Sequence, residues 1–270
     1  MKVKKPIKLE IAHSAGRLLD IEEYIILKNV SEVTIDEIAN KFNISKSSSY
    51  RMLNTLFRKG YLDHGKGERK YYLGFKIIEI GWAAISKNQL AKASSQYLEK
   101  LVNLTGESAI LGILHGNEVF NIEKLGGRGI LRIDVEVETR APIHCTSLGK
   151  ALLAWLPDYE IEEILKNMKF QKYTTITICN KNLFLEDLKK TKKRGYAITG
   201  EEYVLGTCSI AVPIRNDQHK VIAALSLVVP KARFTNERLD GFAKYLFSIS
   251  KKIEATLSTI KENISDGGAV

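Results

Sequence analysis

The sequence lacks the features of a secreted, membrane-spanning or disulfide-stapled protein. Its three cysteines, Cys145, Cys179 and Cys208, are too few and too scattered for a disulfide framework. No apolar run reaches the roughly 18 residues that a membrane span needs. The basic N-terminal residues have no apolar segment of a secretory signal behind them. We therefore expect a cytoplasmic protein with no membrane partner.

Positive charge is what the sequence has in excess. The formal net charge is +10 over 270 residues, and residues 43–71 hold seven basic side chains against only Asp63 and Glu68. This local balance of +5 within 29 residues is half of the whole excess. A concentrated basic surface favours a polyanionic partner.

Residues 14–44 have the pattern of two helices followed by a tight turn. In residues 14–28 the apolar side chains recur at the i, i+3, i+4, i+7 spacing of an amphipathic helix. A second helix is predicted after Thr34, a good N-cap, and Glu37 completes a capping-box pattern. Residues 42–44 are too few for an ordinary loop, so a third helix should follow at once, as in a helix-turn-helix.

This third helix begins after Ser45, its N-cap, and ends before Gly60, which suits a left-handed terminating position. Its apolar side, which we expect to face the core, holds Tyr50, Leu53 and Phe57, with Leu56 adjacent. Its other side is wholly polar, short near the start and basic further on. That side holds Ser47, Arg51, Asn54 and Arg58. Such a face is what a recognition helix in the major groove of DNA requires.

A β-hairpin is predicted directly behind this helix. Two short aromatic and apolar runs, residues 61–62 and 71–73, enclose a basic segment that contains glycine. A hairpin in this place is a wing that contacts phosphates or the minor groove; the alternative is a plain surface hairpin behind two ordinary helices. The DNA-binding residues predicted on helix and wing are Ser45, Lys46, Ser47, Ser48, Arg51, Asn54, Arg58, Lys66, Arg69 and Lys70.

The rest of the chain predicts a linker and a second domain. Residues 1–74 form the winged helix-turn-helix domain, residues 75–88 a linker helix, residues 89–264 an effector-binding domain and residues 265–270 a tail. Strands of the second domain are predicted at 108–114, 118–125, 130–137, 196–199, 207–215 and 220–229, and helices at 89–104, 147–156, 158–168, 183–194 and 234–264. The hairpins indicate an antiparallel sheet with flanking helices, an α+β fold.

Several stretches together resemble the IclR family of bacterial and archaeal transcription regulators, from about Ala15 to Leu257. They are residues 45–56, 72–75, 142–151 and 194–197, then Glu201, Glu202, Gly206, Cys208, Pro213 and Ile214, and residues 223–227 before Pro230. The resemblance implies a GAF-like effector domain and a homodimer or homotetramer. It also implies an operator of double-stranded DNA with dyad symmetry, and a small organic effector, often a carboxylate.

Candidate effector-binding residues follow from the motifs of the second domain. They are Thr146, Ser147, Glu202, Cys208 and Ser226. Thr146 and Ser147 open a helix whose N–H groups suit an anion, although they could simply cap it. The family often has a second small polar residue two positions after Ser226. Here that residue is Val228, which suggests a less polar pocket.

Several further alternatives stay open at this stage. Lys150 either adds charge to the pocket or faces solvent. Cys208 faces the ligand by family position, whereas a buried structural cysteine is the usual case. Glu201 and Glu202 either order the pocket or are merely solvated.

The histidines and cysteines raise two rival functions, a metal-binding sensor and a GAF-type cysteine-dependent methionine sulfoxide reductase. The adjacent pair His144 and Cys145 is a poor chelate, and no CxxC or HxxxH spacing occurs. A reductase needs an activated thiolate, which a sequence does not reveal. Residues 126–129 are rich in glycine but lack the Lys-Ser/Thr ending of a phosphate-binding loop. We expect a regulator and not an enzyme, with no cofactor and no metal site.

Overall fold

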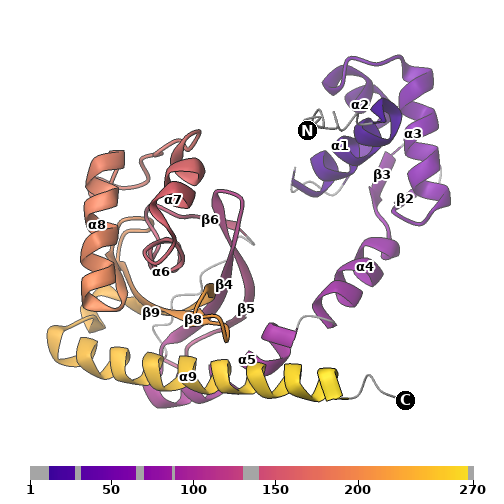
Figure 1. Cartoon of the computed structure of the whole chain (residues 1–270). Coiled ribbons are helices and arrows are strands. Elements are labelled where there is room, and N and C mark those ends of the chain that lie inside the picture. Colours follow the sequence, from indigo (N-terminus) through magenta and orange to yellow (C-terminus); the bar gives the residue numbers. More distant parts are fainter. Residues whose placement is uncertain (1–11, 28–31, 65–69, 87–88, 130–139, 267–270) are drawn as a thin grey trace, which may run out of the picture. The chain divides into compact units, whose positions relative to one another are not determined.

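The computed structural model describes residues 12–27, 32–64, 70–86, 89–129 and 140–266 (Figure 1). By its internal contacts the chain divides into two compact units, Met1–Lys87 and Asn88–Val270. Each unit has its own hydrophobic core. The units are therefore described one after the other.

The N-terminal unit is a helix-turn-helix with a small antiparallel sheet. Its elements are α1 (His13–Leu27), β1 (Val33–Thr34), α2 (Ile35–Lys41), α3 (Lys46–Arg58), β2 (Leu62–His64), β3 (Lys70–Leu73) and α4 (Phe75–Ser86). The strand order is β1-β3-β2, so β2 and β3 form the predicted hairpin and β1 extends it. The predicted winged helix-turn-helix is confirmed. The two-residue strand β1 was not foreseen, because so short a strand leaves no pattern.

Side-chain caps fix the ends of the helices in this unit. The Thr34 hydroxyl accepts a hydrogen bond from the Glu37 backbone N–H at 3.2 Å, as the capping pattern predicted. The Glu37 carboxylate accepts from the Tyr24 hydroxyl at 2.8 Å, which ties α1 to α2. Asn43, in the turn between α2 and α3, has a left-handed φ of 50°. These contacts fix α2 against α1, and the turn at Asn43 leads from α2 into α3.

The far end of α3 determines where the wing begins. Gly60 has a φ of +79°, and Tyr61 N–H donates to Leu56 O at 2.9 Å, as in a Schellman motif. The predicted left-handed Gly60 is thus confirmed. A Cβ on Gly74, after β3, would lie 2.4 Å from Gly60 O. Only glycine allows this close approach, which seats the base of the hairpin on the end of α3.

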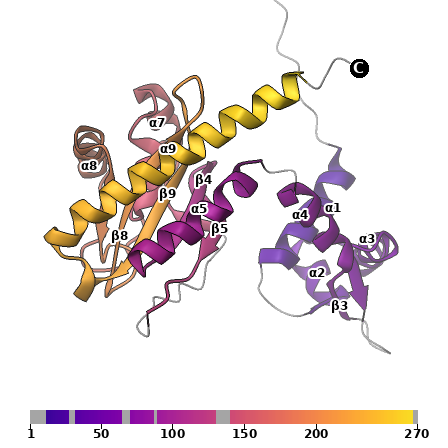
Figure 2. The same cartoon turned by 90° about the horizontal axis from the view of Figure 1, so that it is seen from below.

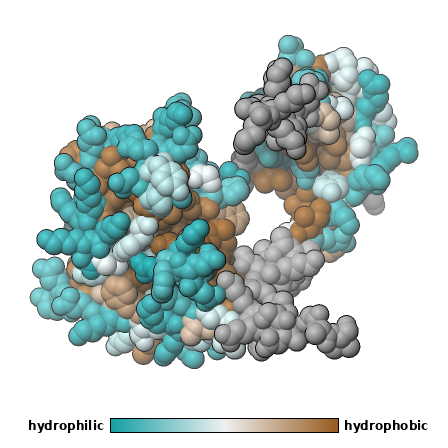
Figure 3. Space-filling model, in the orientation of Figure 1, coloured by the Kyte–Doolittle hydropathy of each residue, from teal (hydrophilic) through white to brown (hydrophobic). Residues whose placement is uncertain are grey.

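Helix α4 leaves much of its apolar surface uncovered within its own unit. Phe75 and Ile78 are 66% and 61% exposed, and Ile80 is also exposed. Figure 3 shows hydrophobic surface on the described part of this helix. Contiguous exposed apolar surface of this kind usually marks an interaction site.

Among the residues that the structure describes, the C-terminal unit is built on a six-stranded sheet. Its elements are α5 (Gln89–Thr105), β4 (Ser108–His115), β5 (Glu118–Leu125), β6 (Arg140–Pro142), α6 (Ser147–Leu153), α7 (Asp158–Leu165), α8 (Lys181–Arg194), β7 (Ala197–Gly200), β8 (Thr207–Arg215), β9 (Val221–Pro230), a 3-10 turn (Lys231–Arg233) and α9 (Asn236–Asp266). The order is β6-β5-β4-β9-β8-β7 with every neighbouring pair antiparallel. The strand predicted at 130–137 lies outside the described residues.

Helices cover both faces of this sheet. One core forms where α5 and α9 pack on it, with Leu101, Leu225 and Leu246 fully buried. The other core lies on the opposite face, where α6, α7 and α8 pack, with Leu153 and Phe184 fully buried. Figure 2 shows α5 and α9 together on one side of the strands. The predicted α+β arrangement of an antiparallel sheet with flanking helices is confirmed.

Candidate functional site

The polar side of α3 lies in solvent along most of its length. Ser47, Arg51 and Arg58 are exposed, and Asn54 is half-buried. At the N-terminus the Ser45 hydroxyl accepts from Ser48 N–H at 3.2 Å. The hydroxyls of Ser47 and Ser48 each lie 2.9 Å from that of Ser45. The start of α3 therefore presents a cluster of short hydroxyl side chains beside the Arg51 guanidinium.

The buried side of α3 differs from the prediction at two positions, since Tyr50 is exposed and Phe57 is only partly buried. Ser49, Leu53 and Leu56 are the buried residues, whereas Tyr50 is 51% exposed. The prediction that Tyr50 faces the core is wrong. Ser49 takes that place because its hydroxyl donates to Ile35 O at 2.9 Å, and this satisfies its polar group inside the contact between α2 and α3.

Two of the predicted DNA-binding lysines form ion pairs with carboxylates. Lys46 Nζ lies 2.9 Å from an oxygen of Asp36, and Lys70 Nζ lies 3.1 Å from one of Glu32. All four side chains are well exposed, so water can replace each pair at little cost. Lys66 and Arg69, predicted at the tip of the wing, lie outside the described residues.

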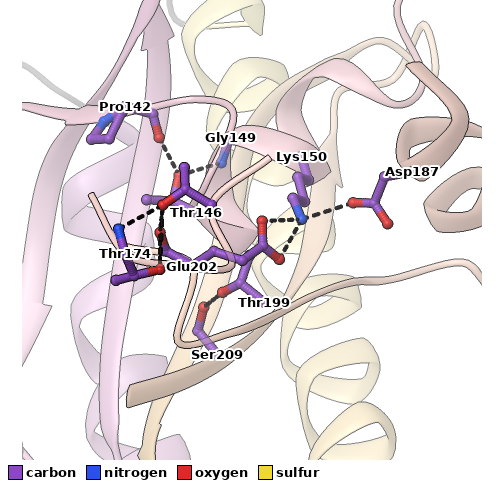
Figure 4. Close-up of polar contacts among 10 residues, drawn as sticks. Pro142, Thr146, Gly149, Lys150, Thr174, Asp187, Thr199, Glu202 and Ser209 are labelled. Atoms are coloured by element: carbon purple, nitrogen blue, oxygen red, sulfur yellow. Dashed lines mark hydrogen bonds and ion pairs between the residues drawn. The ribbon is translucent and has the colours of Figure 1, made fainter. Parts of the chain in front are cut away.

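In the C-terminal unit, Thr146 caps α6. Its hydroxyl donates to Pro142 O at 2.7 Å and accepts from Gly149 N–H at 3.2 Å (Figure 4). A Cβ on Gly149 would lie 2.2 Å from Ile143 O, so α6 starts tightly packed on the preceding turn. The alternative that Thr146 is a structural cap is therefore the one that the geometry supports.

A pair of buried hydroxyls joins α6 to the sheet. The Oγ atoms of Ser147, on α6, and Ser226, on β9, lie 3.0 Å apart, and both residues are almost fully buried. A second buried pair lies on β7 and β8, where the hydroxyls of Thr199 and Ser209 are 2.6 Å apart. Ser209 pairs with Val228 across the β8–β9 ladder, and Val228 packs against the same core as Leu148 of α6. Both hydroxyl pairs thus lie on the face that α6 covers.

Cys208 lies on the other face of the sheet. It pairs with Val229 across the ladder, and Val229 packs in the core with α5 and α9. Side chains directly opposite in a ladder share one face, so the structure does not bring Cys208 together with Ser226. On β8 the Ser226 face carries Ala211, which pairs directly with Ser226, and the polar residue Ser209, which sequence reasoning missed. The alternating apolar residues Ile210, Val212 and Ile214 were a signal, because they leave Ser209 on the opposite side.

Lys150 and Glu202 form a buried charge centre (Figure 4). Lys150 Nζ lies 2.7 and 2.8 Å from the two carboxylate oxygens of Glu202, and 2.8 Å from an oxygen of Asp187 on α8. The Lys150 side chain is 1% exposed, so it does not face solvent. Burial raises the pKa of Glu202 above its ordinary value, while Lys150 acts to lower it. One ammonium thus holds two carboxylates and adds no unpaired cation to the pocket.

Glu202 also fixes the loop that carries it. Its backbone carbonyl accepts hydrogen bonds from the hydroxyls of Thr177 at 2.6 Å and Thr174 at 3.3 Å. Tyr203 packs edge-on against Tyr173, with ring centroids 4.8 Å apart. Of the two open alternatives for Glu202, ordering of the local structure is supported by these contacts.

The two buried cysteines are poor nucleophiles. Burial raises the pKa of Cys145 to about 12, and that of Cys208 above its ordinary value. A reactive cysteine needs a lowered pKa, so neither thiol fits a cysteine-dependent reductase. Burial lowers the pKa of His144, whose Nε2 lies 2.9 Å from Gln171 O. Among the described residues, no group of three or more His, Cys, Asp or Glu is placed to hold a metal ion.

A helix-turn-helix with a wing and a polar recognition face, joined to an α+β domain, is the architecture of a DNA-binding transcriptional regulator. Within the described ranges, no helix combines the length and the apolar character needed to cross a membrane. Comparison with known proteins identifies the family.

The family model for the bacterial transcriptional regulator IclR C-terminal domain matches residues 82–255, and that for the sugar-specific transcriptional regulator TrmB matches residues 17–76. The HTH-type transcriptional regulator XynR of Escherichia coli is 32% identical over 238 residues, covering 88% of this chain and 94% of XynR. The regulator KdgR of the same organism is 32% identical over 226 residues, covering 84% and 86%. The crystal structure of Thermotoga maritima IclR has a TM-score of 0.71 and 28% identity, covering 92% of this chain and 99% of that one. The chain belongs to the IclR family of transcriptional regulators.

Proposed function

We propose that this protein binds a specific operator in double-stranded DNA and that a small organic effector changes its operator affinity. The observation that carries the proposal is the exposed polar side of α3, with Ser47, Arg51 and Arg58 in solvent. Caps at both ends hold this helix rigidly. A rigid helix that presents a guanidinium and short hydroxyls suits base and phosphate contacts in a major groove.

The protein acts as a homodimer or a larger homo-oligomer in this proposal. A single recognition helix reads too few base pairs for operator specificity, so two are expected on half-sites about one helical turn, or a multiple of it, apart. The exposed apolar residues of α4, Phe75, Ile78 and Ile80, offer a surface for self-association. Movement of this linker helix would change the spacing of two recognition helices.

The effector site of the proposal lies on the face of the sheet that α6 covers. Ser147 and Ser226 provide hydroxyls there, Thr199 and Ser209 provide two more, and the Thr146 cap and the Glu202 loop adjoin them. An apolar surface with a few aimed polar groups is typical of small-ligand sites. Cys208 is left out of this set because it lies on the opposite face. An anionic effector would be bound by hydroxyl and N–H donors, since Lys150 already pairs with two carboxylates.

Arg51→Ala should weaken operator binding by about 1–3 kcal/mol if its guanidinium reads a base. The duplex is first selected from a random pool with the wild-type protein, and affinity is then measured by fluorescence anisotropy. Lys244→Ala is the control, since it removes one exposed positive charge from α9 in the other unit. Unchanged affinity and an unchanged footprint for Arg51→Ala would show that α3 is not the reader.

Ser226→Leu should abolish the response to effector and leave DNA binding by the empty protein intact. The effector is identified beforehand by a thermal-shift screen against sugar acids, aromatic acids and short keto acids. Coupling of about 1–3 kcal/mol between effector and operator is enough for a switch, and it is measured as operator affinity with and without effector.

The matched variant Ser226→Ala, which removes the hydroxyl without adding bulk, should weaken effector binding and keep the fold. A normal effector response in Ser226→Leu would place the pocket elsewhere. Loss of DNA binding together with the fold would show that Ser226 is a core residue only.

A further inference from the structure

An open concavity of about 1090 Å³ lies between α3 and the strands of the wing. It belongs wholly to the N-terminal unit. From α3 it is lined by Lys46, Ser47, Tyr50, Asn54 and Phe57, from the hairpin by His64, Lys70 and Tyr71, and from β1 and α2 by Thr34, Ile35 and Asp36. Most of these side chains carry a hydrogen-bond donor, and two of them are lysines.

Aromatic rings form the inner part of this concavity. The rings of Phe57 and His64 lie 4.4 Å apart, and that of Tyr71 is 6.3 Å from His64. Tyr50 contributes an exposed ring from the adjoining side of α3. Tyr50 and Tyr71 both line the concavity. Tyr50 remains 51% exposed beside these rings.

The two lysines at the edges of the concavity already form ion pairs with carboxylates. Asp36 pairs with Lys46 at 2.9 Å, and Glu32 pairs with Lys70 at 3.1 Å. Glu32 directly precedes β1, and Asp36 lies in the first turn of α2. Exposed pairs of this kind are weak, and a phosphate carries the same charge on similar oxygen acceptors. The concavity is therefore bordered by two cations that hold anionic groups.

The position of the concavity between two DNA-contacting elements decides what kind of ligand fits. A recognition helix enters the major groove, while a wing reaches the neighbouring minor groove. The sugar–phosphate strand that separates these grooves must then pass between helix and wing. Phosphate contacts position a protein on DNA and carry no sequence information of their own.

We propose that the sugar–phosphate backbone of one operator strand lies in this concavity, that the Tyr50 hydroxyl donates to one of its phosphates, and that the strand displaces Asp36 from Lys46 and Glu32 from Lys70. This inference rests on the proposed function, in which α3 reads DNA. Tyr50 is then a positioning residue, which sets the register of α3 on the duplex without distinguishing bases.

Tyr50→Phe tests the phosphate contact with the least change in shape. Affinity is measured for the selected operator and for an unrelated duplex of equal length. Both should fall about tenfold, because a hydrogen bond to a charged group is lost in each. Tyr245→Phe, which alters an exposed tyrosine of α9, is the control and should bind both duplexes as the wild type does.

A methylphosphonate scan identifies the phosphate itself. Each phosphate of the half-site is replaced in turn by a neutral methylphosphonate. One replacement should weaken the wild type about tenfold and cost Tyr50→Phe little more, because the same contact is lost only once. Asp36→Asn should strengthen binding to both duplexes, because a carboxylate no longer competes for Lys46.

The outcomes separate this inference from the function on which it rests. Wild-type affinity of Tyr50→Phe for both duplexes, with an unchanged methylphosphonate scan, would overturn the inference. Weakening confined to the operator, with a changed sequence preference, would mean that Tyr50 reads a base and would overturn it as well. If Arg51→Ala also binds normally, the proposed function fails too. Since Tyr50 is largely exposed, the thermal unfolding of Tyr50→Phe should match that of the wild type and so confirm its fold.

Discussion

Lys150→Met should destabilise the C-terminal unit by about 3–5 kcal/mol, because it leaves buried carboxylates without their cation. The side chain of Glu202 is 12% exposed and that of Asp187 is 24% exposed, so water replaces little of what the ammonium provides. For a unit of this size the midpoint of thermal unfolding should fall by about 6–20 °C. Differential scanning calorimetry measures the transition of this unit.

The loss of stability in Lys150→Met should depend on pH, because it depends on the charge of Glu202. Burial already raises the pKa of this carboxyl, and Lys150 is the group that lowers it, so removal of Lys150 raises the native pKa further. The unfolded chain keeps a glutamate pKa near ~4.3. A carboxyl with a raised native pKa carries no penalty below the unfolded pKa, and its penalty grows as pH rises through the native pKa. The deficit of Lys150→Met should therefore shrink as the pH is lowered from about 8 to about 5.

Two further variants make this test specific. Lys190→Met removes an exposed lysine from α8 and should change stability by less than about 0.5 kcal/mol. The double variant Lys150→Met with Glu202→Leu should recover part of the loss, since it removes a buried charge together with its partner. A stable Lys150→Met at neutral pH would refute the claim that this charge centre stabilises the fold.

Gly149→Ala should cost about 3 kcal/mol or more, because the added methyl group meets backbone and not a movable side chain. A Cβ at this position would lie 2.2 Å from Ile143 O and 2.3 Å from Ile143 Cα. To relieve this overlap α6 must move away from the turn before it. The Thr146 cap, which contacts both Pro142 O and Gly149 N–H, would then be lost. Thermal unfolding and effector binding both report the change.

Gly241→Ala is the matched control for that substitution. Gly241 lies inside α9, and a Cβ there would meet nothing within 4 Å. Alanine in a helix interior is favoured over glycine, so this variant should be stabilised by roughly 0.5–1 kcal/mol. Equal effects of the two substitutions would show that the close contact at Gly149 is not the cause.

Local signals in the sequence predicted most of the DNA-binding unit. The caps at Thr34 and Ser45 and the left-handed Gly60 were all predicted, since each depends on residues within one turn of chain. The rotation of α3 about its axis was not fixed by these signals. A helical wheel placed Tyr50 inward, and the structure places Ser49 there, because only the fold supplies Ile35 O as a partner for the Ser49 hydroxyl.

The arrangement of the candidate effector site could not be predicted from local sequence signals. The residue types on β8 were visible, but a strand turns its side chains to alternate faces, so an error of one position exchanges Cys208 for Ser209. The face itself is decided by the cores that pack on the sheet. In the same way, Ser147 was a candidate from its motif, whereas its contact with Ser226, 79 residues further on, was not visible in the sequence.

The sequence by itself determined the family, the order of the longer helices and strands, and the polar side of α3, because these follow from spacing and from caps within a few residues. The tertiary structure alone decided that Lys150 is buried and not solvated. Its partner Glu202 lies 52 residues further along the chain, and Asp187 is on another helix. Burial of an ammonium is tolerable only where opposite charges meet it. Which charges meet it is fixed by how the chain folds back on itself, and no local pattern records that.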